Sequence, residues 1–159
     1  MTNQDTYTYT QAEQSAESDE LKSFLIFSVG NAEFGIDLAM VKEINKLQPV
    51  SIIPNAKPFC KGIINIRGTI VPVIDLSIKL GFEQDVYDER ACIILIMLDG
   101  EDVGVIVKRV QDVIKVSDEE LLAHPSMSKS GGYQNYVSNI VSTDGRIRQI
   151  LDVNSVFEL

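Results

Sequence analysis

The chain has 159 residues and carries 14 basic against 23 acidic side chains, a formal net charge of −9, with 45% hydrophobic residues. Its length is that of about one ordinary domain, which can bury a core without disulfides or a metal. Nucleic-acid binding is excluded as a class, because it needs a basic face and the sequence has no basic cluster. No apolar run reaches the roughly 18 residues of a membrane span, so we expect no membrane insertion. Two cysteines in the whole chain are typical of a reduced, cytosolic protein.

The first segment, residues 1–21, is polar and holds five acidic and no basic side chains. It has too little apolar surface to form a core, so we predict a disordered N-terminal tail. Without the tail, 14 basic residues face 18 acidic ones. The predicted folded part, residues 22–159, is therefore only mildly acidic.

From residue 22 onward the pattern is that of short strands joined by tight turns. Four hairpins are predicted, each with a glycine in a two-residue turn. Their strands are Phe24–Val29 with Glu33–Leu38, Ile63–Ile66 with Ile70–Ile74, Ala91–Leu98 with Val103–Val107, and Val137–Val141 with Ile147–Leu151. Strands at this spacing predict an all-β sandwich or barrel.

The helical signal is weak and limited to short stretches. Leu38–Ile44 and Asp75–Leu80 each have room for one or two turns, and Asp152–Leu159 predicts a short docked helix. Residues 117–120 (Ser-Asp-Glu-Glu) have the spacing of a capping box, although Pro125 limits any helix that follows.

The two halves of the chain, residues 22–81 and 91–159, carry the same order of features. At an offset of 69 positions the hairpin around Gly35 matches the hairpin around Gly104. At an offset of 77 the hairpin that turns at Gly68 matches the last hairpin. We interpret this order as an internal duplication that gives two similar small β-barrels sharing a central hydrophobic seam. The alternative is that any two hairpins look alike at this level.

No set of residues has the parts of a catalytic, metal or cofactor site. His124, the single histidine, precedes a proline in a polar stretch and is predicted to be a solvated surface residue. Cys60 and Cys92 are isolated, whereas zinc ligands come in close pairs. The sequence contains neither of the glycine motifs that bind phosphate groups, G-x-x-x-x-G-K-[ST] and G-x-G-x-x-G after a strand. We therefore predict no enzyme activity, no catalytic residue, no cofactor and no metal. An enzyme that uses Asp75 or Cys60 is the alternative.

The most unusual stretch is residues 61–76, KGIINIRGTIVPVIDL. Pro72 inside a strand pattern predicts a sheet edge or a bulge, because proline cannot donate to the ladder. Arg67 lies at the turn between two apolar strands and points its rigid guanidinium fork outward. It either pairs with a local acid such as Asp75 or stays available to a partner.

This stretch resembles the CheW family of chemotaxis coupling proteins. The motif G-x-x-N-x-R-G-x-[ILV]-x-P-[ILV]-[ILV]-D-L runs from Gly62 to Leu76. Three blocks carry the match: Phe24–Ile44, Ile52–Gly81 and Asp99–Ile114. The resemblance implies an all-β fold with few short helices, in which two intertwined five-stranded barrels of the Src-homology-3 type share a hydrophobic seam. Agreement is weakest over residues 117–136, where Met127 stands in place of a family aromatic.

The resemblance also implies a function. Family members are non-enzymatic adaptors that bridge the cytoplasmic tips of chemoreceptors to the regulatory domain of the histidine kinase CheA, and join that domain in rings. Such an adaptor is cytoplasmic and is recruited to membrane receptor arrays. The alternative is the same fold in another chemosensory system, such as pilus-based surface motility.

Positions associated with receptor or kinase coupling in such proteins correspond to Val41, Glu43, Gly62, Arg67, Gly68, Ile93 and Val110. The three aliphatic side chains would give apolar contact to a partner, or else pack in the core. Arg67 and Glu43 would fix the register of a partner through charge-assisted hydrogen bonds. The two glycines would act through backbone shape.

Overall fold

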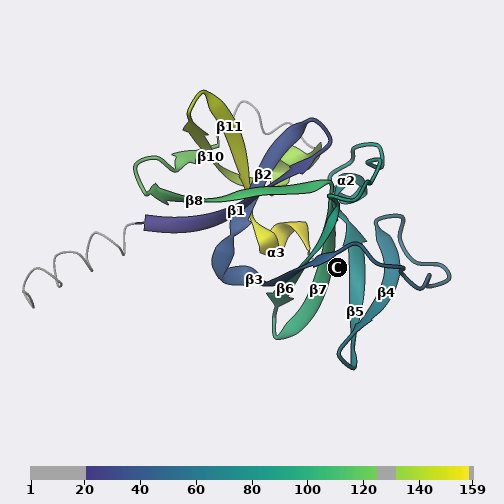
Figure 1. Ribbon diagram of the computed structural model, residues 1–159. Helices are drawn as coiled ribbons and strands as arrows, with labels where there is room; N and C mark the ends of the chain where they lie inside the picture. Colours follow the sequence, from purple (N-terminus) through teal and green to yellow (C-terminus); the bar gives the residue numbers. More distant parts are fainter. Residues whose placement is uncertain (1–20, 125–131, 158–159) are drawn as a thin grey trace, which may run out of the picture.

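The computed structural model describes residues 21–124 and 132–157. Its elements in chain order are β1 (Leu21–Val29), β2 (Ala32–Asp37), the 3₁₀ helix η1 (Leu38–Met40), β3 (Val41–Lys46), β4 (Cys60–Ile66), β5 (Thr69–Asp75), α2 (Leu76–Lys79), β6 (Cys92–Leu98), β7 (Glu101–Val107), β8 (Arg109–Ser117), β9 (Leu122–Ala123), the 3₁₀ helix η3 (Gly132–Tyr136), β10 (Val137–Thr143), β11 (Arg146–Leu151) and α3 (Val153–Val156). The strands form two sheets, which we call barrel 1 (β8-β1-β2-β11-β10-β9) and barrel 2 (β3-β6-β7-β5-β4). Figure 1 shows the two units beside one another, with α3 between them.

All four predicted hairpins are present as antiparallel pairs. In three of their turns Arg67, Asp99 and Asp144 have φ angles of 48°, 52° and 53°, and a glycine with positive φ follows each of them. Two consecutive residues with positive φ form the type I′ turn, whose twist suits a hairpin. The short loops therefore set the strand pairing locally.

The two sheets confirm the predicted pair of similar barrels. Their strand orders coincide when β8-β1-β2-β11-β10 is placed over β3-β6-β7-β5-β4. The registers coincide as well, because Gly35 pairs with Ile150 across β2 and β11 while Gly104 pairs with Val73 across β7 and β5. Each barrel takes strands from both sequence halves, so the barrels are intertwined.

We call β3 and β8 the crossing strands, because each one passes from the barrel that holds the rest of its hairpin unit into the other barrel. Both barrels close through the segment that follows the crossing strand, β3 in barrel 2 and β8 in barrel 1. In barrel 2, Ser51 bridges Ile63 of β4, with N–H to oxygen hydrogen bonds of 2.9 Å in both directions. In barrel 1, Leu122 of β9 pairs with Ile140 of β10 at the equivalent position. The short strand β9 is thus an addition to the five strands that were expected.

Buried apolar side chains of the described residues form three clusters. The central cluster draws on both barrels, with Phe27 and Phe34 from barrel 1 and Ile74 and Ile96 from barrel 2, and it is the predicted shared seam. The interior of barrel 2 holds Ile64, Val71, Val73, Ile93, Leu95 and Ile106. The interior of barrel 1 holds Phe24, Ile26, Val116, Val141 and Ile150.

The short helices at the two aspartates are confirmed. The carboxylate of Asp75 accepts from the N–H of Ser77 at 3.0 Å and caps α2, and Asp152 caps α3 in the same way. Residues 117–120 form the predicted capping-box contacts, but residues 118–120 make a turn that leads into β9 and not a helix. None of the described helices is long and apolar enough to cross a membrane. The predicted tail, apart from its last residue in β1, and Met127 lie outside the described residues.

Two local predictions were wrong. Residues 38–44, expected to be helical, form a single 3₁₀ turn and then enter β3, because β6 offers this extended chain a partner. His124, expected at the surface, is only 8% exposed, and its Nε2 lies 2.5 Å from Oε1 of Gln134. In both cases the local sequence did not reveal the contact that decides the structure, the pairing of β3 with β6 and the contact of His124 with Gln134.

Candidate binding surface

The candidate residues meet in part at the β4–β5 turn of barrel 2. Arg67 lies in this turn with 70% of its side chain exposed, and its Nη2 donates to Oε2 of Glu43 on β3. Asn45 Nδ2 donates to the other carboxylate oxygen at 3.0 Å. The hydrogen bonds from Arg67 and then from Asn45 lower the pKa of Glu43 below its ordinary value. The carboxylate is therefore ionised at neutral pH and holds the guanidinium in place.

Asp75, the acid considered as a local partner of Arg67, lies elsewhere. It is fully buried, and its Oδ1 accepts from the hydroxyl groups of Ser77 at 2.5 Å and Tyr87 at 2.7 Å. Neither the exposed Arg67 nor a substrate can reach this carboxylate. Cys60, the other residue of the enzyme alternative, is half-buried at the start of β4. Among residues 21–124 and 132–157, no three His, Cys, Asp or Glu side chains lie close enough together to hold a metal.

Gly62 and Gly68 act through the backbone at two separate points of barrel 2. Gly62 has a φ of 137°, and a Cβ there would lie 1.9 Å from the carbonyl oxygen of Ser51. Only glycine therefore lets the segment between β3 and β4, which we call the connector, reach the edge of β4 and close the barrel. Gly68 has a φ of 90° and open space where a Cβ would be, and its N–H donates to Oδ1 of Asn65 at 2.8 Å. It serves the turn that presents Arg67.

The three aliphatic candidates do not share one surface. Ile93 is 0% exposed inside barrel 2, so core packing is the role that the structure gives it. Val41 and Val110 are half-buried against the central cluster. Val41 lies opposite Ile96 in β6, and Val110 lies opposite Phe27 in β1. These two valines are duplicates at the offset of 69, at the starts of the crossing strands β3 and β8.

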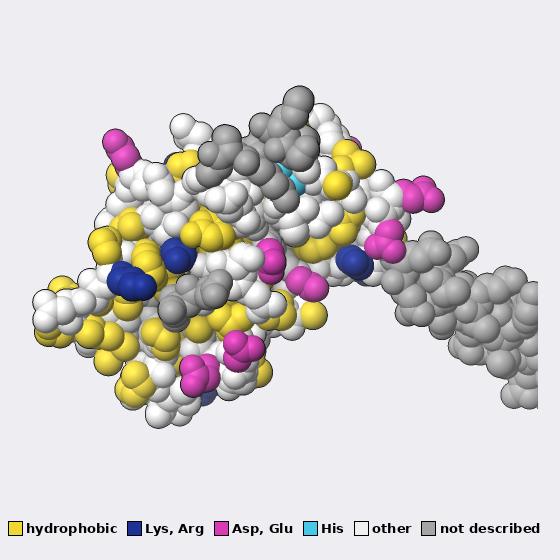
Figure 2. Space-filling model, turned by 180° about the vertical axis from the view of Figure 1, so that it is seen from behind, with side chains coloured by type: hydrophobic (Ala, Val, Ile, Leu, Met, Phe, Trp, Pro, Cys, Tyr) yellow, Lys and Arg dark blue, Asp and Glu magenta, His cyan; other side chains and the backbone are white. Residues whose placement is uncertain are grey.

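Several exposed aliphatic side chains of barrel 2 were missed from the sequence. Ile44 next to Glu43 is 43% exposed, Ile70 beyond the turn is 58% exposed, and Ile52 in the connector is 84% exposed. An open depression of about 340 Å³ separates the end of β3 from the turn, and it is lined by Asn45, Lys46, Leu47, Gln48, Asn65, Ile66 and Arg67. Figure 2 shows hydrophobic side chains gathered on barrel 2 with basic side chains among them. For Ile44 and Ile70 the available signal was their alternation with inward-facing neighbours in β3 and β5.

Comparisons with known proteins agree with this architecture. Residues 23–159 match the family model described as a CheW-like domain. The chemotaxis protein CheW of Klebsiella aerogenes is 33% identical over 135 residues, which cover 85% of this chain and 81% of that protein. The one from Bacillus subtilis is 33% identical over 138 residues, with 86% and 87% covered. The crystal structure of the scaffolding protein TtCheW from Thermoanaerobacter tengcongensis has a TM-score of 0.79 and 30% identity, with 87% of this chain and 93% of that chain covered.

The names of these relatives refer to chemotaxis, which favours the hypothesis of a role in chemotaxis over a role in pilus-based motility. The matched residues include every strand of both barrels beyond the first two residues of β1. The chain therefore belongs to the CheW family, whose members serve as coupling adaptors and scaffolds in chemotaxis.

Proposed function

We propose that this protein is a non-enzymatic adaptor that couples the cytoplasmic tips of chemoreceptors to the histidine kinase CheA. It works in the cytoplasm and reaches membrane receptor arrays through these partners, where it joins the regulatory domain of the kinase in rings. Membership of the CheW family supports this role. The burial of Asp75 also supports it, because the acid named in the enzyme alternative has no access to solvent.

The observation that carries the proposal is the exposed ion pair between Arg67 and Glu43. Exposed ion pairs contribute little to stability. Here, however, Glu43 is held by two donors and the turn fixes Arg67 at a positive φ. The exposed Ile70, three residues after Arg67 in the same hairpin, adds apolar area near this guanidinium. Apolar area around an arginine is typical of protein interfaces, and a helix with an apolar face and an acidic side chain would fit it.

Reconstitution of kinase activation tests the role. Receptor signalling domains, CheA and ATP are mixed with this protein or without it, and the rate of kinase autophosphorylation is measured. We expect strong activation only when all three proteins are present. Absence of binding to both the receptor tip and CheA at micromolar concentration would refute the adaptor role.

A single substitution tests the surface. Arg67→Ala is expected to fold normally and to lose most of the activation, because it removes the fixed guanidinium. Lys22→Ala is the matched control, since Lys22 is also exposed and also pairs with an acid, Asp118. Equal losses of activation in both variants, or a large fall in melting temperature for Arg67→Ala alone, would assign Arg67 a structural role.

A further inference from the structure

The two barrels carry the same N-cap aspartate in different surroundings. Asp75 caps α2, and Asp152, its equivalent at the offset of 77, caps α3. Their N–H groups donate at 2.8 Å to the carbonyls of Phe59 and Tyr136, which are equivalents at the same offset. Yet Asp152 is exposed and Asp75 is 0% exposed. The difference comes from residues 82–91, the segment between Gly81 and β6, which covers Asp75.

This segment, which we call the strap, is tied to barrel 2 and α2 by several hydrogen bonds. Two of them lie at the surface or on the backbone: Lys61 Nζ of β4 donates to Oε1 of Gln84 at 2.7 Å, and the N–H of Phe82 donates to the carbonyl of Ser77 at 2.9 Å. The hydroxyl of Tyr87 donates to Oδ1 of Asp75 at 2.7 Å, and its ring packs against the barrel 2 interior. The N–H of Asp85 donates to Oγ of Ser77 at 3.1 Å. Burial raises the pKa of Tyr87, so its hydroxyl stays protonated and remains a donor.

The strap is tied to barrel 1 as well. Both carboxylate oxygens of Asp85 accept from the N–H of Gly30 in the β1–β2 turn, at 3.0 and 3.1 Å. The ring of Phe82 lies 6.3 Å from the ring of Phe34 and 5.1 Å from that of Tyr133, measured between centroids. The strap thus joins the barrels independently of the crossing strands β3 and β8.

The strap closes over a carboxylate that is only half satisfied. Oδ1 of Asp75 takes all of the donors from Ser77 and Tyr87, and Oδ2 is buried without a hydrogen-bond partner among the described residues. A buried oxygen without a donor is unfavourable relative to water. Opening the strap would return Oδ2 to water, so the closed state contains a local free-energy cost that Asp152 does not have.

We propose that residues 82–91 form a releasable clamp, which holds the two barrels in one relative position and opens separately from the rest of the fold. Tyr87 and Asp85 are its positioning residues, one toward each barrel. Segments with few buried contacts open at free energies below that of global unfolding, and a bound partner shifts such an equilibrium when it prefers one state. The clamp itself does not depend on the proposed function, although its use in signalling does.

Hydrogen exchange of the full chain, read by mass spectrometry, tests the clamp. We expect the amides of the strap and of Gly30 to exchange faster than those of β6 and β7. Tyr87→Phe keeps the ring and removes the donor to Asp75, so it should speed exchange in the strap on the order of tenfold, the effect of one buried hydrogen bond. Exchange in β6 and β7 should stay unchanged. Tyr136→Phe is the matched control, because its half-buried ring packs on the core and its hydroxyl donates to none of the described residues.

A second variant releases the other end. Asp85→Ala should speed exchange at Gly30 and in the strap, whereas Glu83→Ala, an exposed acid of the same segment, should not. Exchange of the strap at the same rate as β6 and β7 would overturn the proposal, and so would a Tyr87→Phe effect spread evenly over the whole chain. Neither result depends on receptor or kinase, so failure of the clamp and failure of the adaptor role are distinguishable.

Discussion

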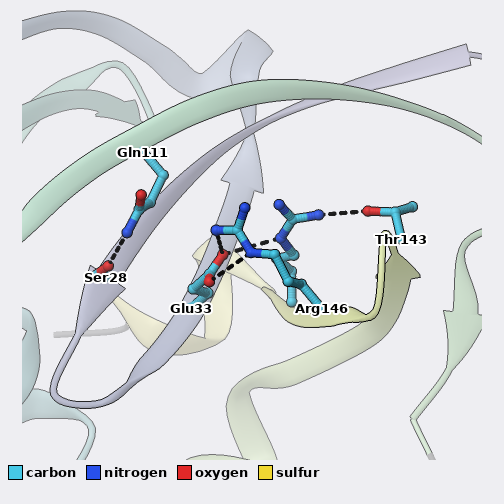
Figure 3. A network of polar contacts seen from close by, with 6 residues as sticks. Ser28, Glu33, Gln111, Thr143 and Arg146 are labelled. Carbon is cyan, nitrogen blue, oxygen red and sulfur yellow. Dashed lines mark hydrogen bonds and ion pairs between the residues drawn. The ribbon is translucent and has the colours of Figure 1, made fainter.

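Barrel 1 and barrel 2 share strand order, register and closure, and differ in what their interiors hold. Arg148 of β11, 3% exposed, occupies the position that the fully buried Val71 takes in barrel 2. Its Nε donates to Glu33 at 3.1 Å and its Nη1 donates to Thr143 at 2.5 Å. Figure 3 shows this network, in which Arg146 reaches the same glutamate. Barrel 2 therefore has an apolar side chain at a position where barrel 1 has a buried arginine, which pairs with the partly exposed Glu33.

The hairpin tips differ as well. In barrel 2, Glu43 meets Arg67, whereas the equivalents in barrel 1 are two acids, Asp112 and Asp144. The turn itself is retained, since Arg67 and Asp144 have φ angles of 48° and 53°. Features that both barrels share, such as turns and N-cap aspartates, are those that the fold requires. Features found in one barrel alone, such as the Glu43–Arg67 pair, are candidates for a role in binding or for a contribution to the stability of that barrel.

The largest expected effect is an exchange of the interior residues. Val71→Arg would bury a cation among apolar side chains, so we expect a loss of about 4 kcal/mol or more in the free energy of unfolding, or no folded protein. Arg148→Val should lose only about 1 kcal/mol, because Glu33 keeps its two hydrogen bonds from Arg146. Urea unfolding of both variants measures the difference. Similar losses would mean that the two interiors tolerate charge alike.

The next effect concerns barrel closure. Gly62→Ala places a Cβ against the carbonyl of Ser51, and we expect a loss on the order of 3 kcal/mol. Gly68→Ala is the control, since it has positive φ but open space, and about 1 kcal/mol of backbone strain is expected. Asn139, the barrel 1 equivalent of Gly62, shows that this demand is specific to barrel 2. Equal losses at both glycines would contradict the steric explanation.

Acid should act on the ion cluster of barrel 1. Burial raises the pKa of Glu33, but hydrogen bonds from Arg146 and Arg148 outweigh it, so the folded pKa lies below the ordinary 4.5. Such a carboxylate stabilises the fold above its unfolded pKa, and the contribution is lost as the pH falls through the folded pKa. Glu33→Gln should remove about 1 kcal/mol at neutral pH and flatten the decline below pH 4.5.

Unfolding free energy as a function of pH measures this effect, with Glu83→Gln as the exposed control. An unchanged slope in Glu33→Gln below pH 4.5 would mean that other carboxylates carry the acid sensitivity. Asp88, whose pKa is lowered by hydrogen bonds from Arg90, is the next one to substitute.

Sequence patterning predicted what is local: the hairpins, the turn glycines, the N-cap aspartates and the repeat. It missed β3 and β8, because short polar-apolar stretches such as VKEINK become strands only when β6 and β1 offer a paired edge. Because the pairing of β3 was not predicted, Glu43 was not predicted as the partner of Arg67 either. Glu43 reaches Arg67 only when β3 lies near the β4–β5 turn, whereas Asp75 is near in sequence but points inward to cap α2.

The candidate site was predicted in part for the same reason. The family resemblance named Glu43 and Arg67 but not the contact between them, and it could not separate the buried Ile93 from the half-buried Val41. Exposure of an aliphatic residue in a strand depends on which face the barrel turns inward. Pairing across 24 positions or more is set by the tertiary fold, not by local propensity.

The smallest expected effect on stability comes from transplanting the barrel 2 tip. Asp144→Arg places a guanidinium at the position equivalent to Arg67, near the acid Asp112, in a turn that already has the required φ. Because both tips are exposed, the melting temperature should stay within about 2 °C of the wild type. Calorimetry and the kinase activation assay then separate two possibilities. If only the barrel 2 tip is used, Asp144→Arg leaves activation unchanged and does not rescue Arg67→Ala, whereas rescue would mean that the partner reads an arginine on either barrel and that the asymmetry between them is not functional.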